Sequence, residues 1–229
     1  MATSGTYNFS PSIGALTLHA FNLCGVRPSA LIQDHFESAR MAANLVLADF
    51  SNKGVNLWQV QLTTISFVAG TATYSVSPTI VNILDLYYTV SYGTGYTNRY
   101  ILPVSRTEFA SYPNPNQIGA VTTYWHDRTF SPTVNFYPTP DGSAASFTFY
   151  ALIQMQDAAM TNGQTPDIPY LYLNAFTKAL AVELATIWAP DRLAMLVPMA
   201  QSAYNAAAAT NVETSQFFIS PTISGYWRT

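Results

Sequence analysis

The residues best suited to acid–base chemistry stand together in the run Trp125, His126, Asp127 and Arg128. Histidine is the side chain that general acid–base catalysis uses most often, and a neighbouring carboxylate can serve as its partner. However, the run ends a strand-like pattern and Pro132 follows closely, so we interpret it as a hairpin turn with an ion pair at its tip. A hydrolase that depends on His126 remains an alternative.

Candidates for metal binding and for nucleophilic catalysis are equally sparse. His19 and His35 fall in two successive predicted helices and could meet, but no cysteine or carboxylate pattern stands at ligand spacing beside them. Cys24 is the one cysteine and lies in an apolar stretch, which predicts a buried and unreactive thiol. Residues 93–95 contain two glycines, but neither a helix nor a lysine follows them as in a phosphate loop. The sequence therefore predicts no catalytic, metal or cofactor site, and a protein that is not an enzyme.

The 229 residues carry unusually little charge. Charged residues make up 9% of the chain, where a soluble domain carries about 25%. The net charge of −3 disfavours a protein that holds nucleic acid by neutralising phosphates, and the 14% of aromatic residues excludes a disordered chain. Charge normally keeps monomers apart in solution, so this composition predicts that neighbouring chains cover much of the surface.

The sequence shows no targeting or membrane segment. Its first residues form neither the basic nor the apolar region of a signal peptide, so we expect synthesis and use without export. The two most apolar windows, residues 42–48 and 193–200, fall well short of the ~20 residues that cross a bilayer. We therefore expect no membrane span.

Apolar residues at helical spacing predict a helix pair near the N-terminus. The first helix begins near Ile13 and ends at Gly25, a residue suited to a left-handed cap. The second covers residues 29–53, and its short connection to the first implies an antiparallel hairpin. Its apolar stripe alternates steps of four and three residues and so holds one helix face: Ile32, Phe36, Ala39, Ala43, Val46 and Phe50.

The middle of the chain alternates β-branched or aromatic residues with polar ones, which is typical of strands. Clusters rich in proline, glycine and asparagine separate these stretches and predict turns. We therefore expect a small antiparallel sandwich or barrel. Its clearest strands are residues 59–68, 71–76, 81–91, 96–102, 120–126, 133–137 and 145–154.

Helical spacing returns after residue 165 and stops before a tail. Pro166 and Pro169 suit a helix start, and Pro190 separates two further helices. The tail, residues 214–229, is apolar and nearly uncharged, so we expect it to dock on a partner or to fold back on its own chain. The two helix stripes are Leu173, Phe176, Leu180, Leu184 and Ile187, then Leu193, Leu196, Ala200, Ala203 and Ala207.

Each helix pair is too thin to bury a core alone, so we expect one four-helix bundle with the β domain inserted between its second and third helices. The predicted fold class is α+β. The helical bundle takes residues 10–57 and 165–212, and the inserted antiparallel β-sandwich or barrel-like domain takes residues 58–156. An extended C-terminal arm takes residues 213–229.

Aromatic residues in the predicted strands allow a second function. Tyr87, Tyr88 and Tyr92, with Phe147, Phe149 and Tyr150, could form a platform on which sugar rings stack. The core of a small sheet produces the same pattern, and we favour that interpretation. A carbohydrate-binding module, or another tail or receptor-binding module carried by the β domain, remains the alternative.

The helical ends resemble the head-to-tail adaptor proteins of short-tailed bacteriophages, a family of connectors or tail accessory factors. The N-terminal stretches that carry the resemblance are AFNLCGVRP at 20–28, ARMAANLVLADF at 39–50 and KGVNLW at 53–58. The C-terminal stretches are IPY at 168–170, LNAFTKALAVELA at 173–185 and AQSAYNAA at 200–207. Together they cover somewhat under half of the chain.

The resemblance implies a structural virion protein of the neck or tail, assembled in the host cytoplasm. It implies a ring of twelve subunits between the portal protein and the tail nozzle or tail fibre protein, through which genomic DNA passes without sequence-specific binding. In this sequence the ring-forming helices would carry Phe36, Phe50, Trp58, Phe176, Trp188 and Tyr204. The portal-docking arm would carry Phe217, Phe218, Ile219, Tyr226 and Trp227. Interface cores are poor in charge and rich in Tyr and Trp, which agrees with the composition.

Overall fold

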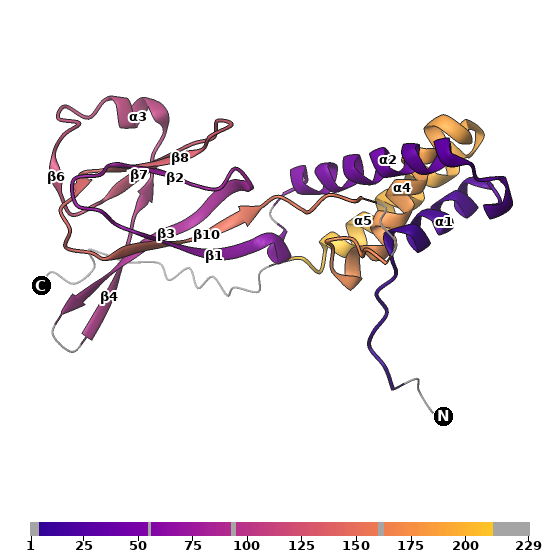
Figure 1. The fold of residues 1–229 in the computed structure, drawn as a ribbon, viewed down its shortest axis with the longest axis horizontal. Helices are drawn as coiled ribbons and strands as arrows, with labels where there is room; N and C mark the ends of the chain where they lie inside the picture. Colours follow the sequence, from indigo (N-terminus) through magenta and orange to yellow (C-terminus); the bar gives the residue numbers. More distant parts are fainter. Residues whose placement is uncertain (1–4, 55, 93–94, 160–162, 213–229) are drawn as a thin grey trace, which may run out of the picture.

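The computed structural model describes residues 5–54, 56–92, 95–159 and 163–212. The molecule is elongated, with helices gathered at one end and strands at the other (Figure 1). We call helices α1, α2, α4 and α5 the helical unit, and residues 60–153 the β unit. The chain enters the β unit after α2 and returns from it before α4.

The N-terminal helix pair forms as the periodicity predicts. Helix α1 spans Ile13–Cys24, with the Ser12 side chain accepting from the Ala15 N–H at its start and Gly25 in the left-handed region at its end (φ 81°). Helix α2 spans Gln33–Asn52. It starts later than predicted because Pro28–Ala30 form a short 3₁₀ turn (η1) and the chain is extended at Leu31 and Ile32.

Helix α4 is the centre of the helical unit. It spans Leu173–Trp188 and packs against α1, α2 and α5, the last spanning Leu193–Ala208. Short 3₁₀ turns precede both helices, at Tyr170–Tyr172 (η3) and Pro190–Arg192 (η4). One core joins all four helices, and its largest fully buried side chains are Ile13, Phe21, Phe50, Tyr172, Phe176 and Leu180.

The inward face of α2 differs from the predicted stripe at its start. Ala39, Ala43, Val46 and Phe50 are buried as expected, but Ile32 and Phe36 are 57% and 38% exposed. His35 lies inward instead, with its ring stacked on Trp188 at 4.0 Å between centroids. Its Nδ1 also accepts from the Ile32 N–H, so this side chain closes the first turn. The polar His35 ring thus occupies the inward position that the apolar spacing predicted for Phe36.

The β unit consists of two four-stranded sheets and one short strand pair. The sheet orders are β1-β10-β3-β4 and β2-β8-β7-β5, and β6 pairs with β9. The strand bounds are β1 Val60–Ser66, β2 Thr73–Ser75, β3 Ile80–Tyr92, β4 Gly95–Tyr100, β5 Leu102–Pro103, β6 Ile118–Gly119, β7 Thr123–Asp127, β8 Thr133–Tyr137, β9 Thr139–Pro140 and β10 Ser146–Ile153.

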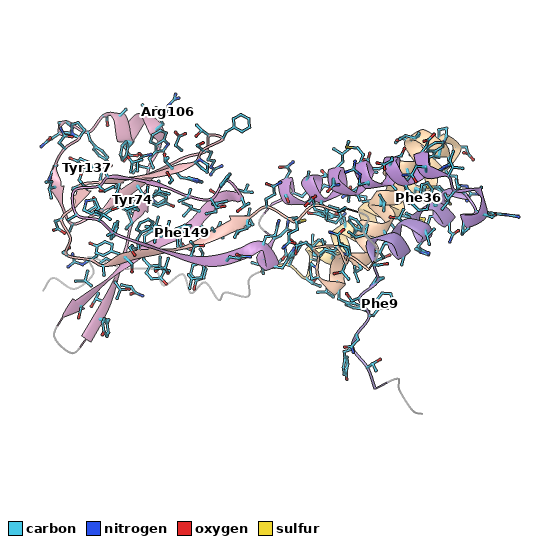
Figure 2. All side chains as sticks on the ribbon, viewed as in Figure 1. Phe9, Phe36, Tyr74, Arg106, Tyr137 and Phe149 are labelled. Carbon is cyan, nitrogen blue, oxygen red and sulfur yellow. The ribbon has the colours of Figure 1, made fainter. Side chains whose placement is uncertain are left out.

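Aromatic side chains fill the space between the two large sheets. Phe147 and Phe149 point inward from β10 and are fully buried, and Phe136 meets Phe147 edge to face at 4.7 Å. Figure 2 shows Tyr74 and Phe149 in this layer. Alternation of apolar and polar residues along β8 and β10 therefore reflects one face in the core and one face outward.

The sheets are mixed, which corrects the prediction of a purely antiparallel domain. The long pairings are antiparallel, but β5 pairs with β7 and β6 with β9 in parallel. Parallel neighbours need a long crossover, and residues 104–122 supply one for β5 and β7. This crossover carries helix α3, Arg106–Ala110, which the sequence did not predict because five residues show no period. The α+β class is confirmed.

Candidate assembly surfaces

The acid–base candidate His126 lies on β7, at the start of the β7–β8 hairpin. Burial, and secondarily the nearby Arg128 charge, lowers the pKa of His126. Neither ring nitrogen has a hydrogen-bond partner among the described residues. The Arg128 guanidinium donates to the Asn82 side chain on β3 and, among the described residues, forms no ion pair with Asp127. The expected hairpin therefore forms without the expected ion pair at its tip. His126 therefore has no hydrogen-bonded carboxylate that would orient its ring for acid–base catalysis.

The Cys24 thiol is buried at the end of α1. It donates to the backbone carbonyl of Ala181 on α4, with 3.2 Å between sulfur and oxygen. Burial raises the pKa of Cys24 to about 11, although the charge of Arg192 acts in the opposite direction. Thiolates rather than thiols are nucleophilic, so the structure supports the interpretation of Cys24 as an unreactive core residue.

The free energy of unfolding is expected to fall as pH rises from 9 towards about 11, in part through Cys24. The folded state keeps this thiol protonated more strongly than the unfolded state does, so the stabilisation is full below the unfolded pKa and is lost through the folded one. Urea unfolding of the wild type and of Cys24→Ala across this range would measure the effect. The difference between the two proteins should shrink with pH, and a constant difference would contradict the assignment.

The two helical histidines do not form a metal site in the part of the chain that the structure describes. His19 is exposed on α1, whereas His35 is buried between Phe21 and Trp188. No group of three or more metal-ligating side chains occurs among the described residues. Within those same residues, no helix is both long and apolar enough to span a bilayer.

Buried amides join the helical unit to the β unit. Gln59 donates from its side chain to the Ile153 carbonyl, at 3.0 Å, and accepts from the Asn56 amide at 2.8 Å. The Asn56 amide also donates to the Phe50 carbonyl at the end of α2. Asn211, just after α5, accepts from the Leu57 N–H at 3.1 Å. This amide joint (Asn56, Gln59 and Asn211) therefore fixes the places where α2 and α5 end and where the chain enters and leaves the β unit.

Replacing Gln59 by leucine is expected to lower the free energy of unfolding by about 1–3 kcal/mol, since it leaves buried polar groups of Asn56 and Ile153 without their partner. Urea denaturation monitored by tryptophan fluorescence would measure this loss. The matched control is Gln61→Leu, because Gln61 is exposed on β1. Equal stability of the two variants would show that the amide joint contributes nothing.

Three of the predicted ring-forming residues gather beside this joint. Trp58 packs on Tyr172 at 4.4 Å between ring centroids, and Phe50 packs on Tyr204 at 5.2 Å. The Lys53 ammonium lies 4.5 Å from the centre of the Tyr204 ring, a cation–π contact. Burial raises the pKa of both tyrosines. Phe50 is fully buried in its own subunit, while Trp58 and Tyr204 are half-buried.

The other three predicted ring-forming residues, Phe36, Phe176 and Trp188, differ in how exposed they are. Phe176 is completely buried in the core under α4, and Trp188 is half-buried against His35. Phe36 points outward from α2 (Figure 2). Phe50 and Phe176 can therefore support a subunit contact only through the shape of the helices, whereas Phe36 can touch a neighbour directly.

Several apolar side chains of the helical unit face outward. They come from α2, α4 and α5, and each is at least half exposed. Exposed apolar groups that gather on one face are typical of protein contacts. The members are Met41, Leu45, Ile187, Met195 and Val197. Among them only Ile187 belongs to a stripe that helical spacing predicted to be buried, and its 60% exposure corrects that prediction.

Three of the six aromatic residues that could form a sugar-stacking platform lie in the core of the β unit. Phe147, Phe149 and Tyr88 are at most 2% exposed. Tyr150 is 41% exposed and Tyr87 is half-buried, while the side chain of Tyr92 lies outside the described residues. Within the described part of the β unit, the most exposed aromatic side chains are instead Tyr96 on β4 and Phe130 at the tip of the β7–β8 hairpin. The core interpretation of these strands is therefore the correct one for three of the six residues.

The residues of the C-terminal arm lie outside the described residues; they are Phe217, Phe218, Ile219, Tyr226 and Trp227.

Comparison with known proteins addresses the family directly. No curated protein sequence matches the chain. The model of the SU10 adaptor protein family matches residues 26–222, which include helices α2, α4 and α5 and the whole β unit. The chain therefore belongs to the SU10 adaptor protein family, an adaptor family of the phage head-to-tail connector.

Proposed function

We propose that this protein is the head-to-tail adaptor of a tailed phage and forms a ring of twelve subunits between the portal and the tail nozzle or fibres. The match to the adaptor family over residues 26–222 carries the proposal. The family consists of structural phage proteins, and membership implies a virion component that binds other phage structural proteins. The low charge and the exposed apolar side chains of α2, α4 and α5 support close contact with neighbours.

In this proposal each part of the chain has its own contact. The helical unit is a four-helix bundle that builds the ring, and the β unit is a β-sandwich inserted between α2 and α4. The C-terminal arm, residues 213–229, docks on the portal through its aromatic and apolar residues. The amide joint supports this arrangement because Asn211, two residues before the arm, is bonded to Leu57 at the base of the β unit.

The β unit would contact the tail nozzle or a tail fibre protein. Tyr96 is 78% exposed on the edge strand β4, and the side chain of Phe130 is wholly exposed at a hairpin tip. Aromatic side chains of this kind often supply most of the binding energy at an interface. A receptor-binding role for the β unit would use the same exposed residues, and binding of the full chain to tail proteins rather than to glycans would distinguish the two.

The charge of the proposed ring suits a passage for DNA. Twelve copies at −3 each carry about −36, and a negative channel repels phosphate groups instead of retaining them. DNA would therefore slide through the ring without sequence-specific binding.

Sedimentation of the purified chain with purified portal rings from the same phage tests the function. We expect the chain to sediment with the portal and to do so equally well in the absence of DNA. A chain that stays in the supernatant as a monomer at every concentration tested would overturn the proposal.

A further inference from the structure

The segment before α1 exposes aromatic side chains that its own subunit does not cover. Residues 5–11, which we call the N-terminal arm, form neither helix nor strand and leave the helical unit (Figure 1). Tyr7 is fully exposed and Phe9 is 69% exposed, and the Phe9 ring approaches Tyr170 edge to face, with 6.3 Å between the ring centroids. Figure 2 shows Phe9 on this projecting segment.

The base of the N-terminal arm is nevertheless fixed. Ser12 caps α1, and the Ile13 N–H donates to the Gln164 carbonyl at 2.8 Å. Seven extended residues reach about 23 Å, so the arm can extend from a defined point across a neighbouring molecule. Uncovered aromatic rings favour burial by roughly 25 cal/mol for each Å² of apolar surface removed from water, which predicts that a partner covers them.

The same subunit carries a groove of about 170 Å³ between α2 and α5. Both helices rest on α4, which forms the floor of the groove with Ala179 and Val182. An engineered apolar cavity of about 150 Å³ binds benzene, so this groove has room for one aromatic ring. Its apolar walls come from Leu45 and Val46 on α2 and from Val197 and Ala200 on α5.

The rim of the groove is polar and suits an uncharged aromatic peptide. Lys53 pairs with Asp49 and lies over the Tyr204 ring at one end, and Glu183 stands on the floor side. An incoming ring beside Lys53 gains a cation–π contact, and a tyrosine hydroxyl can donate to either carboxylate. Residues 5–11 contain no charged side chain that either Lys53 or Glu183 would repel.

The arm and the groove belong to different surfaces of the helical unit. The arm leaves beside α1 and η3, on the lower side in Figure 1, whereas α2 forms the upper side. A contact between two different surfaces of identical subunits is heterologous, and when repeated it closes into a ring or grows into a filament. This is the kind of contact that a ring of adaptor subunits needs.

We propose that the N-terminal arm of one subunit docks in the groove between α2 and α5 of the next copy, with the Phe9 ring between Leu45 and Val197. The proposal rests on the proposed ring and names one of its contacts. The arm lies before residues 26–222, which the family model matches.

Crosslinking of the full chain tests the docking directly. In a Cys24→Ala background, Asn8→Cys, which keeps the Phe9 ring, and Val197→Cys are made singly and together, assembled on portal rings and treated with a short bis-maleimide. A mixture of the two single variants should give covalent dimers and nothing larger, because each chain carries one cysteine. The double variant should give covalent oligomers of every size up to the full ring. Pairing Asn8→Cys with Ser202→Cys is the control, because Ser202 is exposed on α5 but does not line the groove.

Three results would overturn the docking. The first is a double variant that crosslinks only within one chain, and the second is equal crosslinking through Ser202→Cys. The third is a ring that assembles on the portal without any crosslink, which would leave the adaptor function standing. Absence of any assembly on the portal would instead contradict both proposals.

Affinity supplies an independent readout that no crosslinker perturbs. Replacing Tyr7 and Phe9 together by alanine should weaken self-association at least about tenfold, since buried aromatic anchors dominate interfaces. Phe9→Leu should retain most of the affinity because the groove is apolar. Unchanged self-association of the double alanine variant would overturn the docking.

Discussion

Removal of residues 213–229 is expected to abolish binding to the portal while leaving the fold intact. Both hydrophobic cores are filled by buried side chains from residues 13–207, and the amide joint ends at Asn211. The free energy of unfolding should therefore change by no more than about 0.5 kcal/mol, as is usual away from packed sites. The portal affinity, in contrast, should fall by at least about a hundredfold, because several aromatic anchors are lost together.

The measurement pairs urea unfolding with sedimentation on portal rings, using the truncated and the full chain. A matched control replaces Thr214, Ser215 and Gln216 by alanine, which keeps Phe217 and Phe218 in place and should bind normally. Loss of folding in the truncated chain would mean that the segment belongs to the core. Full portal binding by the truncated chain would contradict the role of the arm.

Replacement of Phe176 by alanine is expected to lower the free energy of unfolding by about 3–5 kcal/mol, the usual loss when a fully buried phenylalanine is truncated. Phe176 is 0% exposed and lies on α4, the helix against which α1, α2 and α5 all pack. A cavity here loosens all three contacts at once. Assembly should fail as well, because a ring contact needs the helices in fixed positions.

Ile187→Ala is the control for this substitution, since Ile187 is on the same helix but 60% exposed. Urea unfolding should show a loss for Ile187→Ala within about 0.5 kcal/mol. A loss below about 1 kcal/mol for Phe176→Ala would contradict the central position of α4. If Ile187→Ala folds normally but assembles poorly, Ile187 itself lies in a subunit contact.

The long helices could be predicted because their signals are local. For α1, both the apolar period from Ile13 and the left-handed cap at Gly25 were predicted, and the helix spans Ile13–Cys24. The longer strands were predicted for the same reason, since alternation and turn residues are read within a few positions, whereas the two-residue strands β6 and β9 fall outside every predicted range. The longest antiparallel strands, β1, β3 and β10, all fall where alternation predicts them.

The features that the sequence did not reveal depend on contacts between distant residues. His35 turns inward because Trp188, far along the chain, offers a stacking surface. The buried amides of Asn56 and Gln59 look like ordinary loop residues until Asn211 and Ile153 are placed beside them. The parallel pairing of β5 with β7 likewise needs the crossover through α3.

The exposed apolar surfaces were predictable only as a composition. The 9% of charged residues predicts covered surface but does not locate it. The structure shows exposed apolar side chains on α2, α4 and α5 and two aromatic side chains on the N-terminal arm. Helical spacing had marked Val46 and Ala200 as core positions, whereas both also line a groove between two helices.

Electron microscopy of the full chain mixed with portal rings from the same phage tests the adaptor function most directly. We expect a second ring below the portal, with twelve copies of the chain and an open central channel. Portal rings that stay bare, while the chain remains monomeric at a mass of 25.1 kDa, would contradict it.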